Sequence, residues 1–97
     1  MKAVIIFTGG GPVLFLTSYD SFAHPGFLAK LNGRGISKFI AHEISIDKVK
    51  RKYGKHFDVL GNDIKETDDL RCLDYNGFNV FHNFSLKELG DPIYHEA

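Results

Sequence analysis

The stretch MKAVIIFTGGGPVLFLTSY, residues 1–19, contains two apolar runs on either side of GGGP. Residues 3–8 and 13–18 are both rich in Val, Ile, Leu, Phe and Thr, and the glycines and proline between them are typical of a turn. We therefore predict a β-hairpin. Because apolar residues occupy consecutive positions in both strands, both faces of the hairpin should be covered, as in the centre of a sheet.

Two other interpretations of this stretch are disfavoured by its sequence. A signal peptide or a membrane span needs a continuous apolar segment, of roughly 20 residues for a span, whereas Gly9–Pro12 interrupts this one. A phosphate-binding loop leads into a helix, whereas the VLFLTS that follows GGGP has the composition of a strand. We expect no membrane segment and no nucleotide bound by this loop.

The residues after the hairpin predict a helix and then a third strand. Phe27, Leu28 and Leu31 recur at helical spacing in a helix that starts near Ser21, and NGRG is a typical helix stop. The apolar segment SKFIAHEI, residues 37–44, follows as a strand. Strand, helix and strand in this order predict a right-handed crossover that makes the second and third strands parallel neighbours.

A strongly basic helix is predicted over residues 46–55, with Ser45 as its N-terminal cap. Ile46, Val49 and Tyr53 form an apolar stripe that should face the core. The other faces carry five cations, which are Lys48, Lys50, Arg51, Lys52 and Lys55.

A second hairpin is predicted further along the chain. Residues 56–60, HFDVL, form a candidate short strand, and residues 61–69 are too polar to bury. In residues 69–84, DLRCLDYNGFNVFHNF, the pair Asn76 and Gly77 is typical of a type I′ turn. This turn would pair Cys72 with Phe81 and create a partly apolar face, a candidate interface formed by Leu70, Cys72 and Phe81.

These elements predict one α+β domain that covers residues 1–97. The expected sheet is mixed, with about five to six strands in two hairpins and one parallel crossover. Two main helices accompany it. A short C-terminal helical turn is expected in SLKELG, residues 85–90, where Ser85 and Glu88 form a capping box.

The composition gives no sign of a charged partner or a cofactor. Twelve Lys and Arg balance twelve Asp and Glu, so no global field attracts nucleic acid or anionic lipid. The single cysteine, Cys72, has no partner for an internal disulfide, which favours a reducing, cytoplasmic compartment. Because no Cys or His spacing typical of metal ligands occurs, we predict neither a structural metal nor a cofactor.

Four polar residues are the candidate catalytic site. If the second and third strands are parallel neighbours, their ends would bring together Asp20, His24, His42 and Glu43. Histidines with carboxylates suit general acid–base chemistry or metal binding. The sequence favours a simpler interpretation, in which Asp20 or Ser21 caps a helix, His24 lies on its exposed first turn, and His42 and Glu43 point to opposite faces of a strand.

Three functions follow from these observations. The favoured one is a non-catalytic binding or regulatory module that acts through protein–protein contact, as a homodimer or with another protein. The first alternative is a small enzyme or metal-binding protein with a site near Asp20, His24 and His42. The second is a nucleic-acid-binding module that uses helix 46–55, which is disfavoured because no aromatic stacking platform is evident beside it and an acidic segment follows. Ligand and substrate stay open.

Overall fold

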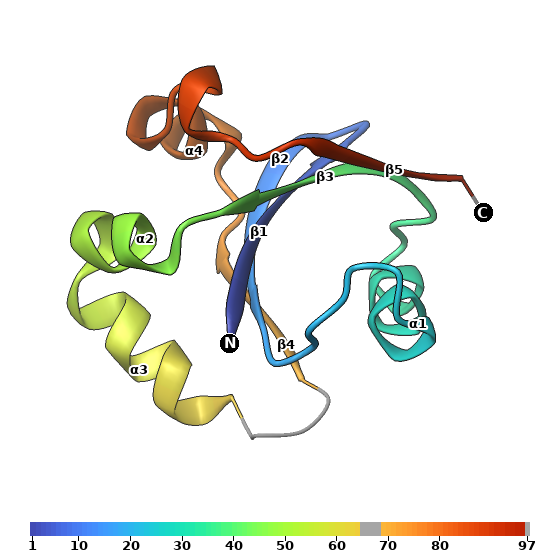
Figure 1. The fold of residues 1–97 in the computed structure, drawn as a ribbon, viewed down its shortest axis with the longest axis horizontal. Helices are drawn as coiled ribbons and strands as arrows, with labels where there is room; N and C mark the ends of the chain where they lie inside the picture. The colour runs from blue at the N-terminus through green and yellow to red at the C-terminus, as the bar shows by residue number, and fades with distance from the viewer. Residues whose placement is uncertain (65–68, 97) are drawn as a thin grey trace.

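The computed structural model describes residues 1–64 and 69–96 and shows one sheet with helices on both faces (Figure 1). Its elements are β1 (Lys2–Thr8), β2 (Gly11–Thr17), α1 (Pro25–Gly33), β3 (Lys38–Ile44), α2 (Ile46–Tyr53), α3 (Lys55–Asp63), β4 (Leu70–Asp74), α4 (Gly77–Asn83), the 3-10 turn η1 (Leu86–Glu88) and β5 (Pro92–Glu96). The five strands lie in the order β4-β2-β1-β3-β5, and every neighbouring pair is antiparallel. The predicted α+β class is confirmed, whereas the predicted mixed sheet is wrong.

The N-terminal hairpin is confirmed and forms the centre of the sheet. β1 and β2 pair along their whole length. Ala3 and Ile5 pack into the core under α2, α3 and α4, whereas Val4 and Ile6 pack into the core under α1. All four side chains are at most 1% exposed. Consecutive apolar residues in β1 therefore serve two cores, one on each face of the sheet.

The predicted parallel crossover is wrong. α1 does connect β2 to β3, but β3 pairs with β1 and is antiparallel to it. β1 therefore lies between β2 and β3, which point in the same direction without sharing hydrogen bonds. The physical reason is that β1 is apolar on both faces and still has one unpaired edge after the hairpin forms. The chain crosses one face of the sheet as α1, and β3 then pairs with the free edge of β1.

The second hairpin is also wrong, because residues 77–83 form α4. Asn76 is the cap of this helix, and its Oδ1 accepts hydrogen bonds from the backbone N–H groups of Phe78 and Asn79 at 3.0 and 3.3 Å. Gly77 does not have the positive φ that a type I′ turn requires. The same Asn-Gly pair that is typical of a hairpin turn thus begins a helix.

The basic helix is confirmed as α2, which ends at Gly54 with a φ of 52°. The chain then begins α3, so the predicted strand at 56–60 is wrong, and Phe57 packs into the core from a helix. The predicted loop at 61–69 is partly wrong, because its first residues are the last turn of α3. Residues 65–68 of that loop lie outside the described residues.

The capping box is confirmed, and an unpredicted strand follows it. Glu88 Oε2 accepts a hydrogen bond of 2.8 Å from the backbone N–H of Ser85. Beyond η1, Gly90 donates its N–H to the carbonyl of Glu43 at 2.9 Å, and its own carbonyl is 2.8 Å from Nδ1 of His42. These contacts fix the chain beside β3, where it continues as β5.

Tyr53 makes the stability of the fold sensitive to high pH. Its hydroxyl donates a hydrogen bond of 2.7 Å to Asp74, and its ring stacks on Phe84. Burial, together with the Asp74 carboxylate, raises the pKa of Tyr53 from 10.0 to about 12. Because the folded state favours the neutral phenol, this contribution to stability is complete below pH 10.0 and is lost as the pH rises toward 12.

We therefore expect Tyr53→Phe to reduce the loss of stability at alkaline pH. Urea unfolding at pH 8, 10 and 11 would compare the free energy of unfolding of the wild type and the variant, and the wild type should decline more steeply above about pH 10. Lysines titrate in the same range in both proteins, so the difference between the two slopes reports Tyr53. Equal slopes would contradict this account of the Tyr53 environment.

Candidate functional site

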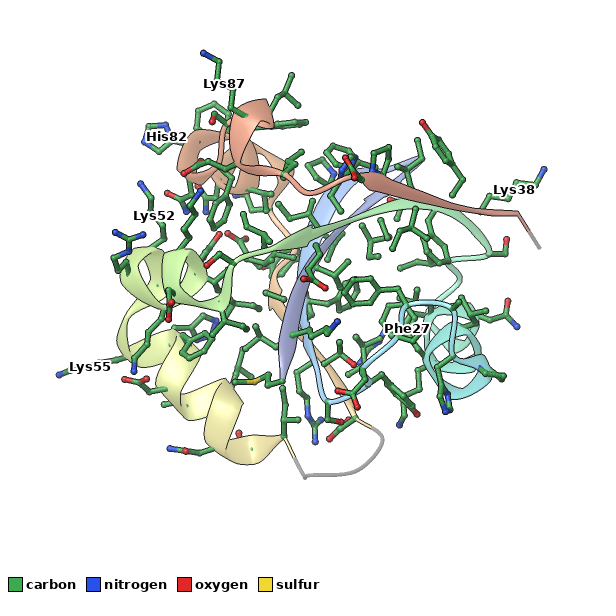
Figure 2. The ribbon with its side chains drawn as sticks, viewed as in Figure 1. Phe27, Lys38, Lys52, Lys55, His82 and Lys87 are labelled. Atoms are coloured by element: carbon green, nitrogen blue, oxygen red, sulfur yellow. The ribbon has the colours of Figure 1, made fainter. Side chains whose placement is uncertain are left out.

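The face that carries α2, α3 and α4 has an open depression of about 510 Å³. It lies where β1 ends and β3 begins, beside Tyr94 of β5. Phe7, Ile40 and Tyr94 line it, and they stand in register across these three strands. Gly9 and Lys38 line its far end. Figure 2 shows Lys38 projecting into solvent at the end of the molecule opposite α2. Apolar side chains therefore line the middle of the depression and a cation lies at its rim.

Exposed aromatic rings connect this depression to α4. The Phe81 ring lies 5.9 Å from the Phe7 ring, and the His42 ring meets Phe7 edge-on at 5.5 Å. Phe81 is 56% exposed and Tyr94 is 70% exposed. We call Phe7, Ile40, His42, Phe81 and Tyr94 the aromatic surface. Such a surface suits contact with apolar side chains of another molecule.

The two edges of the sheet differ in how they are protected. At the β4 edge, the carbonyl of Leu70 accepts a hydrogen bond of 3.0 Å from Arg34, and the carbonyl of Leu73 lies 3.0 Å from His56 Nε2. At the other edge, β5 has no further strand beside it among residues 1–64 and 69–96. It presents Ile93, 40% exposed, and Tyr94 there. The β5 edge is therefore the one open to strand pairing.

His24 and its neighbours begin α1. Nδ1 of His24 accepts a hydrogen bond of 2.9 Å from the N–H of Gly26, so His24 itself is the cap, in place of the expected Asp20 or Ser21. The His24 ring lies 5.0 Å from that of Tyr19, which packs in the core under α1. Asp20 is exposed in the loop before this helix.

The structure does not bring His42 together with His24. His42 stands in register with Ile5 and contacts Phe7, on the face that carries α2, α3 and α4, whereas His24 lies on the α1 face. Glu43 forms an ion pair of 3.2 Å with Lys2. Within the described part of the chain, no three His, Cys, Asp or Glu residues are grouped as a metal ion requires.

The three interface candidates are divided between the two faces. Leu70 is 1% exposed and belongs to the core under α1, against which Cys72 packs. Cys72 pairs with Phe15 of β2, and burial raises the pKa of its thiol. Phe81 lies on α4 over the opposite face and belongs to the aromatic surface. The expected pairing of Cys72 with Phe81 was wrong because residues 77–83 are helical.

The basic residues predicted on helix 46–55 are divided between two helices, since Lys48, Lys50, Arg51 and Lys52 belong to α2 and Lys55 is the first residue of α3. Lys48, Arg51 and Lys52 line a second depression, of about 350 Å³, together with Glu88 of η1. Lys50 and Lys55 are exposed. The residue opposite these cations on α2 is Val49, which is fully buried.

Sequence reasoning missed the residues of the aromatic surface that β5 and α4 provide. Tyr94 belongs to β5, which lies outside the predicted strands, and the sequence predicts a hairpin strand where Phe81 lies in α4. Two residues that favour strands, Ile93 and Tyr94, directly after Pro92 are the signal that indicates an edge strand.

The function has to be inferred from the fold and from the aromatic surface, because the comparisons with known proteins gave no match. No protein-family model, curated protein or solved structure matches the chain. None of the helices in the described ranges combines the length and apolar character that crossing a lipid bilayer requires.

Proposed function

We propose that this protein is a non-catalytic binding module that acts through protein–protein contact, and that its first partner is a second copy of the same chain. The observation that carries the proposal is the open β5 edge beside the aromatic surface. The β4 edge has carbonyls that already accept hydrogen bonds from Arg34 and His56, whereas β5 ends the sheet with exposed Ile93 and Tyr94.

A second copy fits this edge because β5 is complementary to itself. Antiparallel pairing of two β5 strands about a two-fold axis would join two sheets into one and satisfy the outward backbone groups of both strands. Ile93 and Tyr94 point to opposite faces of the strand, so each face of the joint gains one large side chain per copy. On one face, the aromatic surfaces of the two copies would then adjoin around Tyr94.

A reducing, cytoplasmic compartment is part of the proposal. Cys72 is a free thiol that is partly buried against the core under α1. A thiol in this position behaves as a small apolar side chain and has no cysteine in the chain with which to form a disulfide.

The test is the oligomeric state of the full chain in solution, measured by sedimentation equilibrium. We expect a dimer at micromolar concentration for the wild type. Tyr94→Lys and Ile93→Lys should each weaken dimerisation at least about tenfold, because every dimer would bury two charged groups at its joint. Val59→Lys is the matched control, since Val59 is 59% exposed on α3 and lies away from β5.

Two results would contradict the proposal. One is a wild type that stays monomeric at several hundred micromolar. The other is a dimer that persists unchanged in both β5 variants, which would move the contact to a different surface. Thermal melting of each variant checks that the monomer stays folded, as expected for exposed side chains.

A further inference from the structure

The surface formed by α2, α4 and η1 concentrates positive charge in a chain with no net charge. Lys48, Arg51 and Lys52 line the same depression. Lys48 is 3.8 Å from Glu88, and the other cations of α2 form no ion pair within residues 1–64 and 69–96. The pKa of Glu88 is lowered by the Ser85 N–H and also by Lys48 and Lys52, which places both lysines close to one carboxylate.

The same side of the molecule carries further basic groups. Figure 2 shows Lys52, His82 and Lys87 projecting outward from α2, α4 and η1 respectively, all on the side opposite Lys38. Two separate elements, α2 and η1, thus contribute cations to one surface, and α4 adds an imidazole ring. Single-stranded nucleic acid, which carries one negative charge per nucleotide, can contact several of them at once.

Exposed rings lie on and before α4, whose C-terminal end contacts α2 through the stacked rings of Tyr53 and Phe84. Phe78 is 78% exposed, and the His82 ring stacks on it nearly parallel, at 6.3 Å and an angle of 7°. Tyr75, which precedes the cap residue of α4, is 84% exposed. This pair of exposed rings does not follow from the sequence, because the predicted hairpin over residues 69–84 places Phe78 within a sheet. Flat exposed rings beside a basic surface are the combination with which proteins stack unpaired bases.

We propose that this surface, defined by Lys48, Arg51, Lys52, Phe78, His82 and Lys87, binds single-stranded nucleic acid. Phosphates would contact the cations of α2 and η1, and a base would stack on Phe78. Unpaired nucleotides fit this surface better than an acidic protein segment does. Carboxylates can pair with the cations but cannot stack on the Phe78 ring, whereas a nucleotide has both a phosphate and a flat base. The inference is independent of the proposed function, since none of these residues belongs to β5.

The test is fluorescence anisotropy of labelled dT12 and U12 with the full-length protein at low salt, and the two oligonucleotides distinguish DNA from RNA. We expect saturable binding. The Arg51→Gln, Lys52→Gln double variant should reduce the slope of log K against log salt by about 1.4 for single strands. Lys38→Gln is the control, because this cation lies at the other end of the molecule (Figure 2) and should leave the slope unchanged.

A second pair of variants tests the stacking. Phe78→Leu keeps an apolar side chain but removes the flat ring, and it should weaken binding at least about fivefold. Phe78→Tyr keeps the ring and should bind like the wild type. Circular dichroism confirms folding, and the cation variants test the proposal even if Phe78→Leu does not fold.

Three outcomes would overturn the inference. The first is the absence of saturable binding to either oligonucleotide at low salt. The second is equal affinity for the oligonucleotides and for polyglutamate of the same length, which would show attraction by charge alone. The third is an unchanged affinity in Phe78→Leu, which would remove the role of the ring.

Discussion

Replacing Phe27 with alanine should lower the free energy of unfolding by about 3–5 kcal/mol. Phe27 is fully buried, and its ring contacts those of Tyr19 and Phe22 at 6.1 and 5.5 Å. The buried residues of α1 are Phe27 and Leu31. Phe27 therefore makes much of the contact that holds α1 on the sheet (Figure 2). A small domain has about 5–15 kcal/mol of stability in total, so the loss would be a large part of it.

Urea unfolding followed by circular dichroism would measure this loss. Leu28→Ala is a suitable control, because Leu28 is the next residue of α1 but only partly buried, and it should lose clearly less stability. A loss below about 1 kcal/mol for Phe27→Ala would mean that α1 does not cover the sheet as described.

Replacing Thr17 with valine should cost about 1–3 kcal/mol although the two side chains have nearly the same shape. Thr17 is fully buried at the end of β2. Its hydroxyl donates to the carbonyl of Asp69 at 2.9 Å and accepts from the N–H of Tyr19 at 3.1 Å. Valine removes both hydrogen bonds and leaves no room for water to replace them.

The same unfolding measurement applies to Thr17→Val, with Thr17→Ser as the comparison that keeps the hydroxyl. Serine loses one buried methyl group, which is worth about 0.8 kcal/mol, but it can keep both hydrogen bonds. A valine variant as stable as the wild type would show that these two hydrogen bonds, one to the residue before β4 and one within the loop after β2, contribute nothing to stability.

The parts of the fold that the sequence predicts correctly are those that local chemistry determines. The hairpin of β1 and β2 joins adjacent segments, and α2 has a regular apolar stripe that Gly54 ends. The strand order depends on which unpaired edge β3 meets, and no local pattern specifies that choice. The prediction of a parallel crossover is wrong for this reason, since β3 pairs with β1 and not with β2.

The segment around Asn76 shows why the second hairpin was misassigned. Asparagine favours both the cap of a helix and a tight turn. The buried residues Val80 and Phe84 are four positions apart, and this spacing fits one face of a strand as well as one face of a helix. Only the packing of α4 over β2 and Phe7 resolves the ambiguity.

The candidate sites can be predicted only in part from the sequence, because they also depend on tertiary packing. The cations of α2 follow directly from the sequence, but the exposed ring pair of Phe78 and His82 depends on α4 being a helix. The aromatic surface depends on β5, whose register beside β3 brings Tyr94 into line with Ile40. The histidines of the predicted catalytic site are conspicuous in the sequence, yet His24 caps a helix and His42 lies on the opposite face of the sheet.

The strand order also determines when the sheet can be completed. Each outer strand pairs with a segment that precedes it by half the chain, since Leu70 pairs with Thr17 and Tyr94 with Ile40. A ribosome therefore releases the three inner strands and α1 well before either border of the sheet is available. During that interval β2 and β3 expose unpaired backbone, and closing two long loops makes the final steps slow compared with those of a helical bundle.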